Sequence, residues 1–194
     1  KNIILTGLRF HFFALLAGMQ AQISRIFAVL YLGTEIVAEV GFIFLVGQLL
    51  LKIPAALNTV MLPEASKTYS VKNYINPIVK VIILTFSFIC VFYIFSDAFV
   101  SVMFGKNYLS IGIYLSFLLP IFFFHAVGII AQTQLNLLGD YSTMNKAILL
   151  GVFTQIGVLF FFPPSIWLVC FSYASFVFIY CFVLIFSLYR MVSK

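Results

Sequence analysis

Long runs of apolar residues alternate with short polar connections along the chain. Each run is close to the roughly 20 residues that a helix needs to cross the hydrocarbon core of a bilayer. The runs are 10–32, 40–62, 77–95, 108–138, 147–162 and 166–188. Strands of a membrane β-barrel would be about ten residues long with alternating polarity, whereas these runs are apolar at consecutive positions. The pattern therefore predicts six transmembrane helices.

Polar and turn-forming residues mark the predicted connections between these runs. The three clearest are the acidic turn 33–39, an outer turn at 96–108, and the loop 139–146, which begins with a helix-stopping glycine. We expect each to be irregular structure.

The composition agrees with a membrane protein. Hydrophobic residues make up 64% of the 194-residue chain, charged residues only 8%, and 25 residues are Phe. A soluble domain of this length could not cover its surface with polar groups. We therefore expect an all-α, polytopic membrane protein, folded as a single six-helix bundle over residues 1–194.

Cations gather at alternate connections. With the N-terminus inside the cell, the cytoplasmic ends hold Lys1, Arg9, Lys67, Lys72, Lys80, Lys146, Arg190 and Lys194. The outer connections hold one cation and three carboxylates, namely Lys106, Glu35, Glu39 and Asp97. The positive-inside rule then places both termini in the cytoplasm. The same bias accounts for the net charge of +6, so we expect no nucleic-acid partner.

The sequence offers little catalytic chemistry. Cys90, Cys170 and Cys181 lie in apolar runs without a CxxC motif or metal-ligand spacing, so they are predicted to be buried thiols. The spans contain no nucleophile–base pair, no metal-binding cluster and no paired carboxylates. We expect no enzymatic activity, no metal and no cofactor.

Polar residues inside three of the runs recur at helical spacing. Their steps of three, four and seven residues place them on one face of each helix. These polar stripes are His11, Gly18, Gln22 and Arg25 in the first run, Gly41, Gln48, Lys52 and Thr59 in the second, and His125, Gly128, Gln132 and Asn136 in the fourth.

Two of these residues, Arg25 and Lys52, carry a positive charge. A charge at bilayer depth costs at least a few kcal/mol, so such a residue is by default a functional candidate whose partner must be found. At about 1.5 Å per residue, Arg25 lies about 10 Å and Lys52 about 18 Å inward from the outer ends of their predicted spans. The nearby Pro54 is predicted to kink the second helix. From these depths, the two side chains could converge on one diphosphate.

Structural explanations exist for the same residues. Arg25 could snorkel to the outer interface, and Lys52 could bond carbonyls that Pro54 frees. His125 could be a satisfied bundle histidine, and each isolated glutamine could join helix to helix.

A set of short motifs runs through nearly the whole chain in a fixed order. They are Ser24-Arg25-Ile26, Val40-Gly41, Lys52-Ile53-Pro54, Met61-Leu62-Pro63 with Ser66, Phe104-Gly105-Lys106-Asn107-Tyr108, and the segment 134–139. In this order they resemble the polysaccharide flippases, the O-antigen-type translocases of lipid-linked oligosaccharides in the multidrug/oligosaccharidyl-lipid/polysaccharide exporter superfamily.

The resemblance implies a two-lobe transporter, in which two six-helix lobes enclose a cavity that alternates between the two sides of the membrane. This chain looks like the second lobe, hence the C-terminal half of a longer protein; it begins with Lys1 and shows no signal peptide. The implied partners are a lipid-linked oligosaccharide, membrane lipids, a missing first lobe or a second copy, and the polysaccharide polymerase machinery. The implied location is the bacterial cytoplasmic (inner) membrane. Relatives commonly carry an Asp two residues after the first-helix Arg, where this chain has Phe27, so a coupling role for that carboxylate is not carried over.

The resulting hypothesis is that the chain flips a polyprenyl-diphosphate-linked oligosaccharide. Arg25 and Lys52 would bind the diphosphate, because cations suit phosphate oxygens. The residues expected to contact sugar hydroxyls are His11, Gln22, Gln48, His125, Gln132 and Asn136.

Two alternatives remain. A multidrug or cation antiporter of the same superfamily would need carboxylates inside the membrane, but the five acids fall in predicted connections or at span ends. A structural membrane subunit would tolerate neutral residues in place of Arg25 and Lys52 without loss of export.

Overall fold

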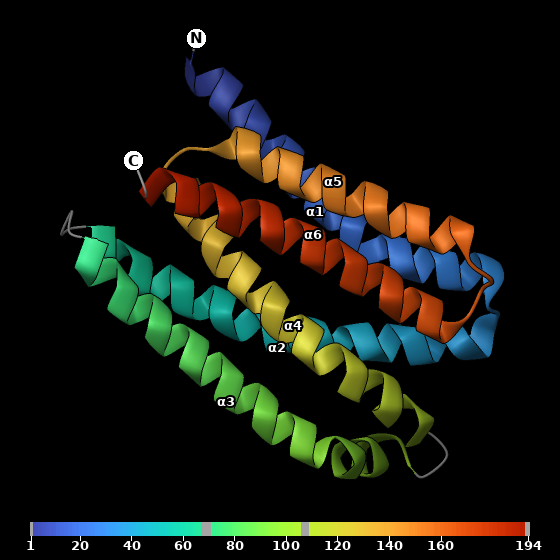
Figure 1. Ribbon diagram of the computed structural model, residues 1–194. Helices are drawn as coiled ribbons and strands as arrows, with labels where there is room; N and C mark the ends of the chain where they lie inside the picture. Colours follow the sequence, from blue (N-terminus) through green and yellow to red (C-terminus); the bar gives the residue numbers. More distant parts are fainter. Residues whose placement is uncertain (1, 67–70, 106–108, 193–194) are drawn as a thin grey trace. The chain divides into compact units, whose positions relative to one another are not determined.

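The computed structural model describes residues 2–66, 71–105 and 109–192, which form long helices joined by short connections (Figure 1). The helices are α1 (Asn2–Tyr31), α2 (Thr34–Ser66), α3 (Val71–Phe104), α4 (Leu109–Leu137), α5 (Tyr141–Phe161) and α6 (Ile166–Val192). The described part of the chain contains no β-strand. The predicted all-α class is confirmed.

Each of these helices contains a segment long and apolar enough to cross a membrane. In the described residues the segments are Gly7–Tyr31, Ile36–Ala56, Val79–Val102, Ile111–Leu137, Tyr141–Phe161 and Ile166–Met191. The chain is thus a polytopic membrane protein.

The predicted acidic turn at 33–39 is wrong beyond its first residue. Gly33 has φ +83°, a left-handed conformation that glycine adopts without strain and that commonly ends helices. The Gly33 carbonyl then accepts a hydrogen bond from Val37 N at 3.2 Å, so α2 starts at Thr34. Glu35 and Glu39 therefore lie on α2 itself.

The predicted outer turn at 96–108 is mostly helical. α3 continues to Phe104, and Gly105, with φ +85°, ends it. Ser96 fits this helix because its hydroxyl donates to the Tyr93 carbonyl at 3.1 Å. Lys106, Asn107 and Tyr108 lie outside the described residues.

The predicted loop at 139–146 is much shorter than expected. Gly139, with φ +72°, follows α4, and α5 begins at Tyr141. Asp140 caps α5, since its carboxylate accepts from Thr143 N at 3.1 Å and from the Thr143 hydroxyl at 2.6 Å. A side-chain acceptor at the N-cap satisfies a backbone donor that is otherwise unpaired. The helix can therefore begin immediately after the glycine.

The chain divides into two compact units, Lys1–Phe42 with Ala131–Lys194, and Ile43–Ile130. The boundaries fall inside α2 and α4, so each of these helices contributes to both units. The single bundle expected from the sequence stays a prediction.

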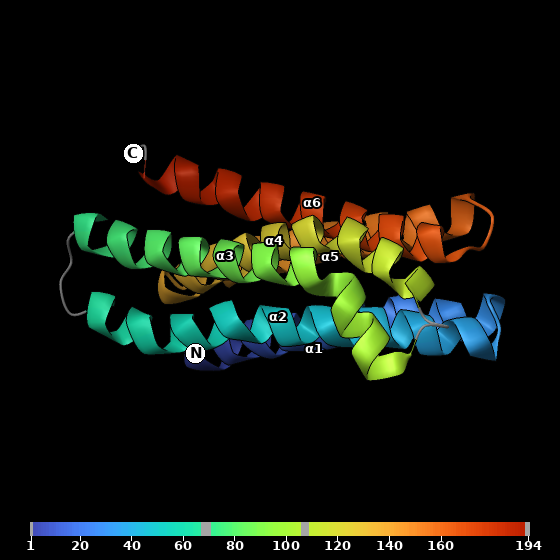
Figure 2. The ribbon, with the colours of Figure 1, turned by 90° about the horizontal axis from the view of Figure 1, so that it is seen from below.

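In the first unit α5 and α6 form an antiparallel pair, and α1 packs along both (Figures 1 and 2). The closest approach is at Gly151 of α5. A Cβ atom placed there would lie 2.7 Å from the Phe176 ring and 3.2 Å from the Phe176 carbonyl oxygen. The absence of a side chain at Gly151 thus lets the α6 backbone approach α5.

The second unit also has a glycine at a close contact between helices. A Cβ atom at Gly47 of α2 would overlap the Phe122 ring of α4, which is almost fully buried. The hydroxyls of Ser96 on α3 and Ser116 on α4 lie 3.5 Å apart and share a hydrogen bond. Small and weakly polar residues at helix contacts are typical of membrane proteins, because they let the backbones come close.

Replacing Gly151 by Ala should destabilise the α5–α6 pair by about 1–3 kcal/mol, the usual cost of overpacking a filled core. Thermal denaturation of the purified protein in detergent measures the effect. Gly157→Ala on the same helix is the matched control, because nothing lies within 4 Å of a Cβ there. If both variants melted alike, the close contact at Gly151 would carry no stability.

Candidate functional site

The polar stripe of α1 lies mostly away from its packed face. The buried residues of α1 are Phe13, Leu16, Gln20, Ser24, Phe27 and Ala28. Because each residue advances about 100° around a helix, His11 and Gln22 fall roughly half a turn from the centre of this face, whereas Arg25 lies at its edge, about 60° from Ala28. His11 and Gln22 are accordingly exposed and Arg25 is half-buried.

Within the polar stripe of α1, Arg25 carries the least satisfied polar group. Its Nε atom is buried and has no hydrogen-bond partner among the described residues. A buried charged donor without an acceptor costs free energy, because it has lost water without gaining a bond. An acceptor supplied from outside the described chain would remove that cost.

On α2 the predicted site residues again avoid the packed face. Lys52 is exposed and Gln48 is half-buried, whereas Ile43, Val46 and Leu50 are buried. Thr59, from the same stripe, donates its hydroxyl to the Ala55 carbonyl of its own helix at 3.0 Å.

Arg25 and Lys52 each lie within a candidate membrane span, Gly7–Tyr31 and Ile36–Ala56. Their depths in a bilayer stay predictions. Arg25 and Lys52 belong to different units, and the hypothesis that both bind one diphosphate stays a prediction.

On α4 the predicted site residues His125, Gln132 and Asn136 are all half-buried. Gln132 is already engaged inside the first unit, because the Tyr180 hydroxyl donates to its Oε1 at 2.6 Å. Tyr180 is buried. The Gln132 carbonyl thus serves helix–helix contact, which leaves its NH₂ group for any sugar.

Sequence reasoning missed a buried polar network between α1 and α5. Gln155 is fully buried. Its Nε2 donates to Ser24 Oγ at 3.0 Å, and its Oε1 accepts from Gln20 Nε2 at 3.4 Å. The four-residue spacing of Gln20 and Ser24, and the isolated amide of Gln155 in an apolar run, are the signals that could have identified the network.

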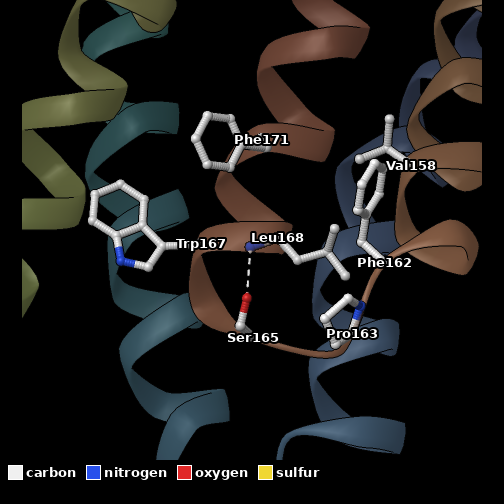
Figure 3. A pocket seen from close by; sticks show the side chains of 7 residues that line it. All are labelled: Val158, Phe162, Pro163, Ser165, Trp167, Leu168 and Phe171. Atoms are coloured by element: carbon white, nitrogen blue, oxygen red, sulfur yellow. Dashed lines mark hydrogen bonds between the residues drawn. The ribbon is translucent and has the colours of Figure 1, made fainter.

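Two pockets are apolar and do not contain the predicted site residues. One, of about 520 Å³, lies where α5 ends and α6 begins, and Figure 3 shows its lining. The Ser165 side chain in this lining accepts a hydrogen bond from Leu168 N at 3.0 Å and so caps α6. The other, of about 450 Å³, lies on α3 and α4 around Pro120. Neither suits a sugar or a phosphate, since such groups need hydrogen-bond partners.

The described residues contain no group of three or more His, Cys, Asp or Glu side chains that could hold a metal ion. Cys170 and Cys181 are buried, as predicted, whereas Cys90 is half-buried.

No protein-family model, curated protein or solved structure matches this chain. The likeness to the polysaccharide flippases stays a prediction that rests on the motifs.

The stripe of α1 should be reachable from water if it lines a hydrophilic cavity. In a protein whose native cysteines are replaced by alanine, Gln22→Cys should react with a charged methanethiosulfonate reagent. Leu16→Cys, on the packed face of the same helix, should stay unreactive. The same assay extends to positions 48 and 132. An unreactive position 22 would mean that the stripe faces lipid or a dry contact.

Proposed function

We propose that the protein moves a polyprenyl-diphosphate-linked oligosaccharide across the bacterial cytoplasmic membrane by alternating access. The observation that supports this most is the buried, unpartnered Nε of Arg25 within a candidate membrane span. Since none of the described residues accepts from this Nε, an acceptor on a ligand would pair it.

An anion is the ligand that fits this donor. A guanidinium presents several N–H groups in a fixed fork that matches phosphate oxygens, and the bonds are charge-assisted. His11 and Gln22 on the same face can donate to and accept from sugar hydroxyls. The stripe therefore combines a cation for phosphate with neutral polar groups for a glycan.

Lys52, which is exposed in the candidate span Ile36–Ala56, binds the diphosphate as well in this proposal. The lipid tail stays in the bilayer while the polar headgroup passes through the protein.

Arg25→Ala and Lys52→Ala proteins should insert normally but restore surface polysaccharide poorly in a flippase-null cell. A charged hydrogen bond contributes about 1.5–3 kcal/mol, so transport should fall by about 10- to 100-fold. Arg190→Ala, which removes an exposed cation stacked on Phe186, is the control and should leave transport unchanged. Full restoration by the Arg25/Lys52 double variant would refute the phosphate role and favour a structural subunit.

A cation antiporter is the second candidate, because one carboxylate, that of Asp97, lies within a candidate membrane span. Asp97 lies on α3, five residues before the end of the candidate span Val79–Val102, and its side chain is exposed. A carboxylate there can meet a proton or a cation. This function predicts that Asp97→Asn abolishes proton-driven efflux of cationic dyes from cells, while the flippase function predicts no such efflux from the unmodified protein.

A further inference from the structure

Gln155 occupies a position where hydrogen bonding, rather than burial, determines the choice of residue. Its neighbours Met144, Ile148 and Leu159 on α5 are buried and apolar, so an apolar side chain would suit the packing. Both ends of the Gln155 amide instead bond to α1: Nε2 donates to Ser24 Oγ, and Oε1 accepts from Gln20 Nε2. Replacing a set of buried hydrogen-bonding groups by apolar groups of similar shape is often close to neutral for stability. The hydrogen bonds of the network therefore have an effect on α1 that apolar packing alone would not have.

This effect is to fix the orientation of α1 relative to α5. Apolar contacts between helices tolerate small rotations and slips, whereas hydrogen bonds between named atoms specify one rotation and one axial position. Gln20 and Ser24 are four residues apart, so they lie one above the other on α1. Holding both to a single residue of α5 fixes how α1 is turned about its own axis.

Arg25 follows Ser24 directly and is therefore placed by that rotation. A turn of α1 by one residue, about 100°, would carry Arg25 to the direction that Ser24 now occupies, against α5. The guanidinium would then face the packed interior of the unit. With Ser24 held on Gln155, Arg25 stays at the edge of the buried face, about 100° from Ser24.

We propose that Gln155 is a positioning residue, which through Gln20 and Ser24 holds Arg25 in the orientation that accepts a diphosphate. This inference rests on the proposed function of Arg25. The fifth helix thereby has a functional role, although its sequence suggests mainly structural support.

The test uses the full-length protein in detergent, with farnesyl diphosphate as the probe and farnesol as the phosphate-free control, followed by calorimetric titration. Gln155→Leu should weaken farnesyl diphosphate binding by about tenfold and leave any farnesol binding unchanged. Thr154→Val is the matched control, because the Thr154 hydroxyl donates only to the Leu150 carbonyl of its own helix, at 2.8 Å. It should bind as the unmodified protein does.

A second variant separates positioning from folding. The triple variant Gln20→Leu, Ser24→Ala, Gln155→Leu leaves no member of the network unpaired, so its melting temperature should return towards that of the unmodified protein. Its affinity for farnesyl diphosphate should remain about tenfold weak. Recovery of affinity together with stability, or unchanged affinity in Gln155→Leu, would overturn the positioning role.

If the proposed function of Arg25 is wrong, the binding experiment gives a different result. If Arg25→Ala bound farnesyl diphosphate as tightly as the unmodified protein, or if that protein did not bind it, then Arg25 would hold no diphosphate. Orientation is then read directly from Arg25→Cys labelled with a charged thiol reagent. A labelling rate at least threefold lower with Gln155→Leu supports the positioning of residue 25, and an unchanged rate refutes it.

Discussion

Hydrocarbon offers no hydrogen bonds, and this constraint shapes every level of the structure. Inside a bilayer each backbone N–H and C=O must be paired by the protein itself, which long helices achieve internally. At helix ends the same demand is met by local groups: Asp140 at the start of α5, Ser165 at the start of α6, and the carbonyl of Gly33 at the start of α2. Several polar side chains within the spans are paired in the same way. Thr154 and Ser172 donate to carbonyls of their own helices, and Gln155 bonds to two residues of α1.

Against that background, the buried Nε of Arg25 is an exception with a physical meaning. Three neutral side-chain atoms, Thr85 Oγ1, Gln134 Nε2 and Asn145 Oδ1, are also buried without a partner among the described residues, but Arg25 Nε alone among these four belongs to a charged group. Lys52 and Gln22, which share the outward-facing stripes, are exposed. A surface that would be costly against lipid is tolerable against water or a polar cargo. The proposed transport of an anionic lipid-linked glycan follows from that contrast.

The sequence predicted the helices well, because long apolar runs have few alternative structures in a membrane. It predicted the connections poorly, since one residue can end a helix. Gly33, Gly105 and Gly139 adopt positive φ, and the residues beyond the first and third of them return at once to helix. The spacing also predicted which polar residues share a helix face, but it did not predict their hydrogen-bond partners. The bonds of Gln132 to Tyr180 and of Gln155 to Ser24 depend on which helices are neighbours, and periodicity within one run carries no such information.

Tyr180 connects these polar contacts to the close packing of the first unit. Its hydroxyl holds Gln132, its ring stacks on Phe176 at 5.4 Å between centroids, and Phe176 sits where α5 has no side chain at Gly151. The end of α4, the middle of α6 and the middle of α5 are thus joined in an unbroken line by one hydrogen bond, one ring stack and one backbone contact. Such a line resists shear, because sliding any one of these segments along its neighbour would break an interaction. These three segments of the first unit are therefore held in register with one another by side-chain contacts as well as by the chain.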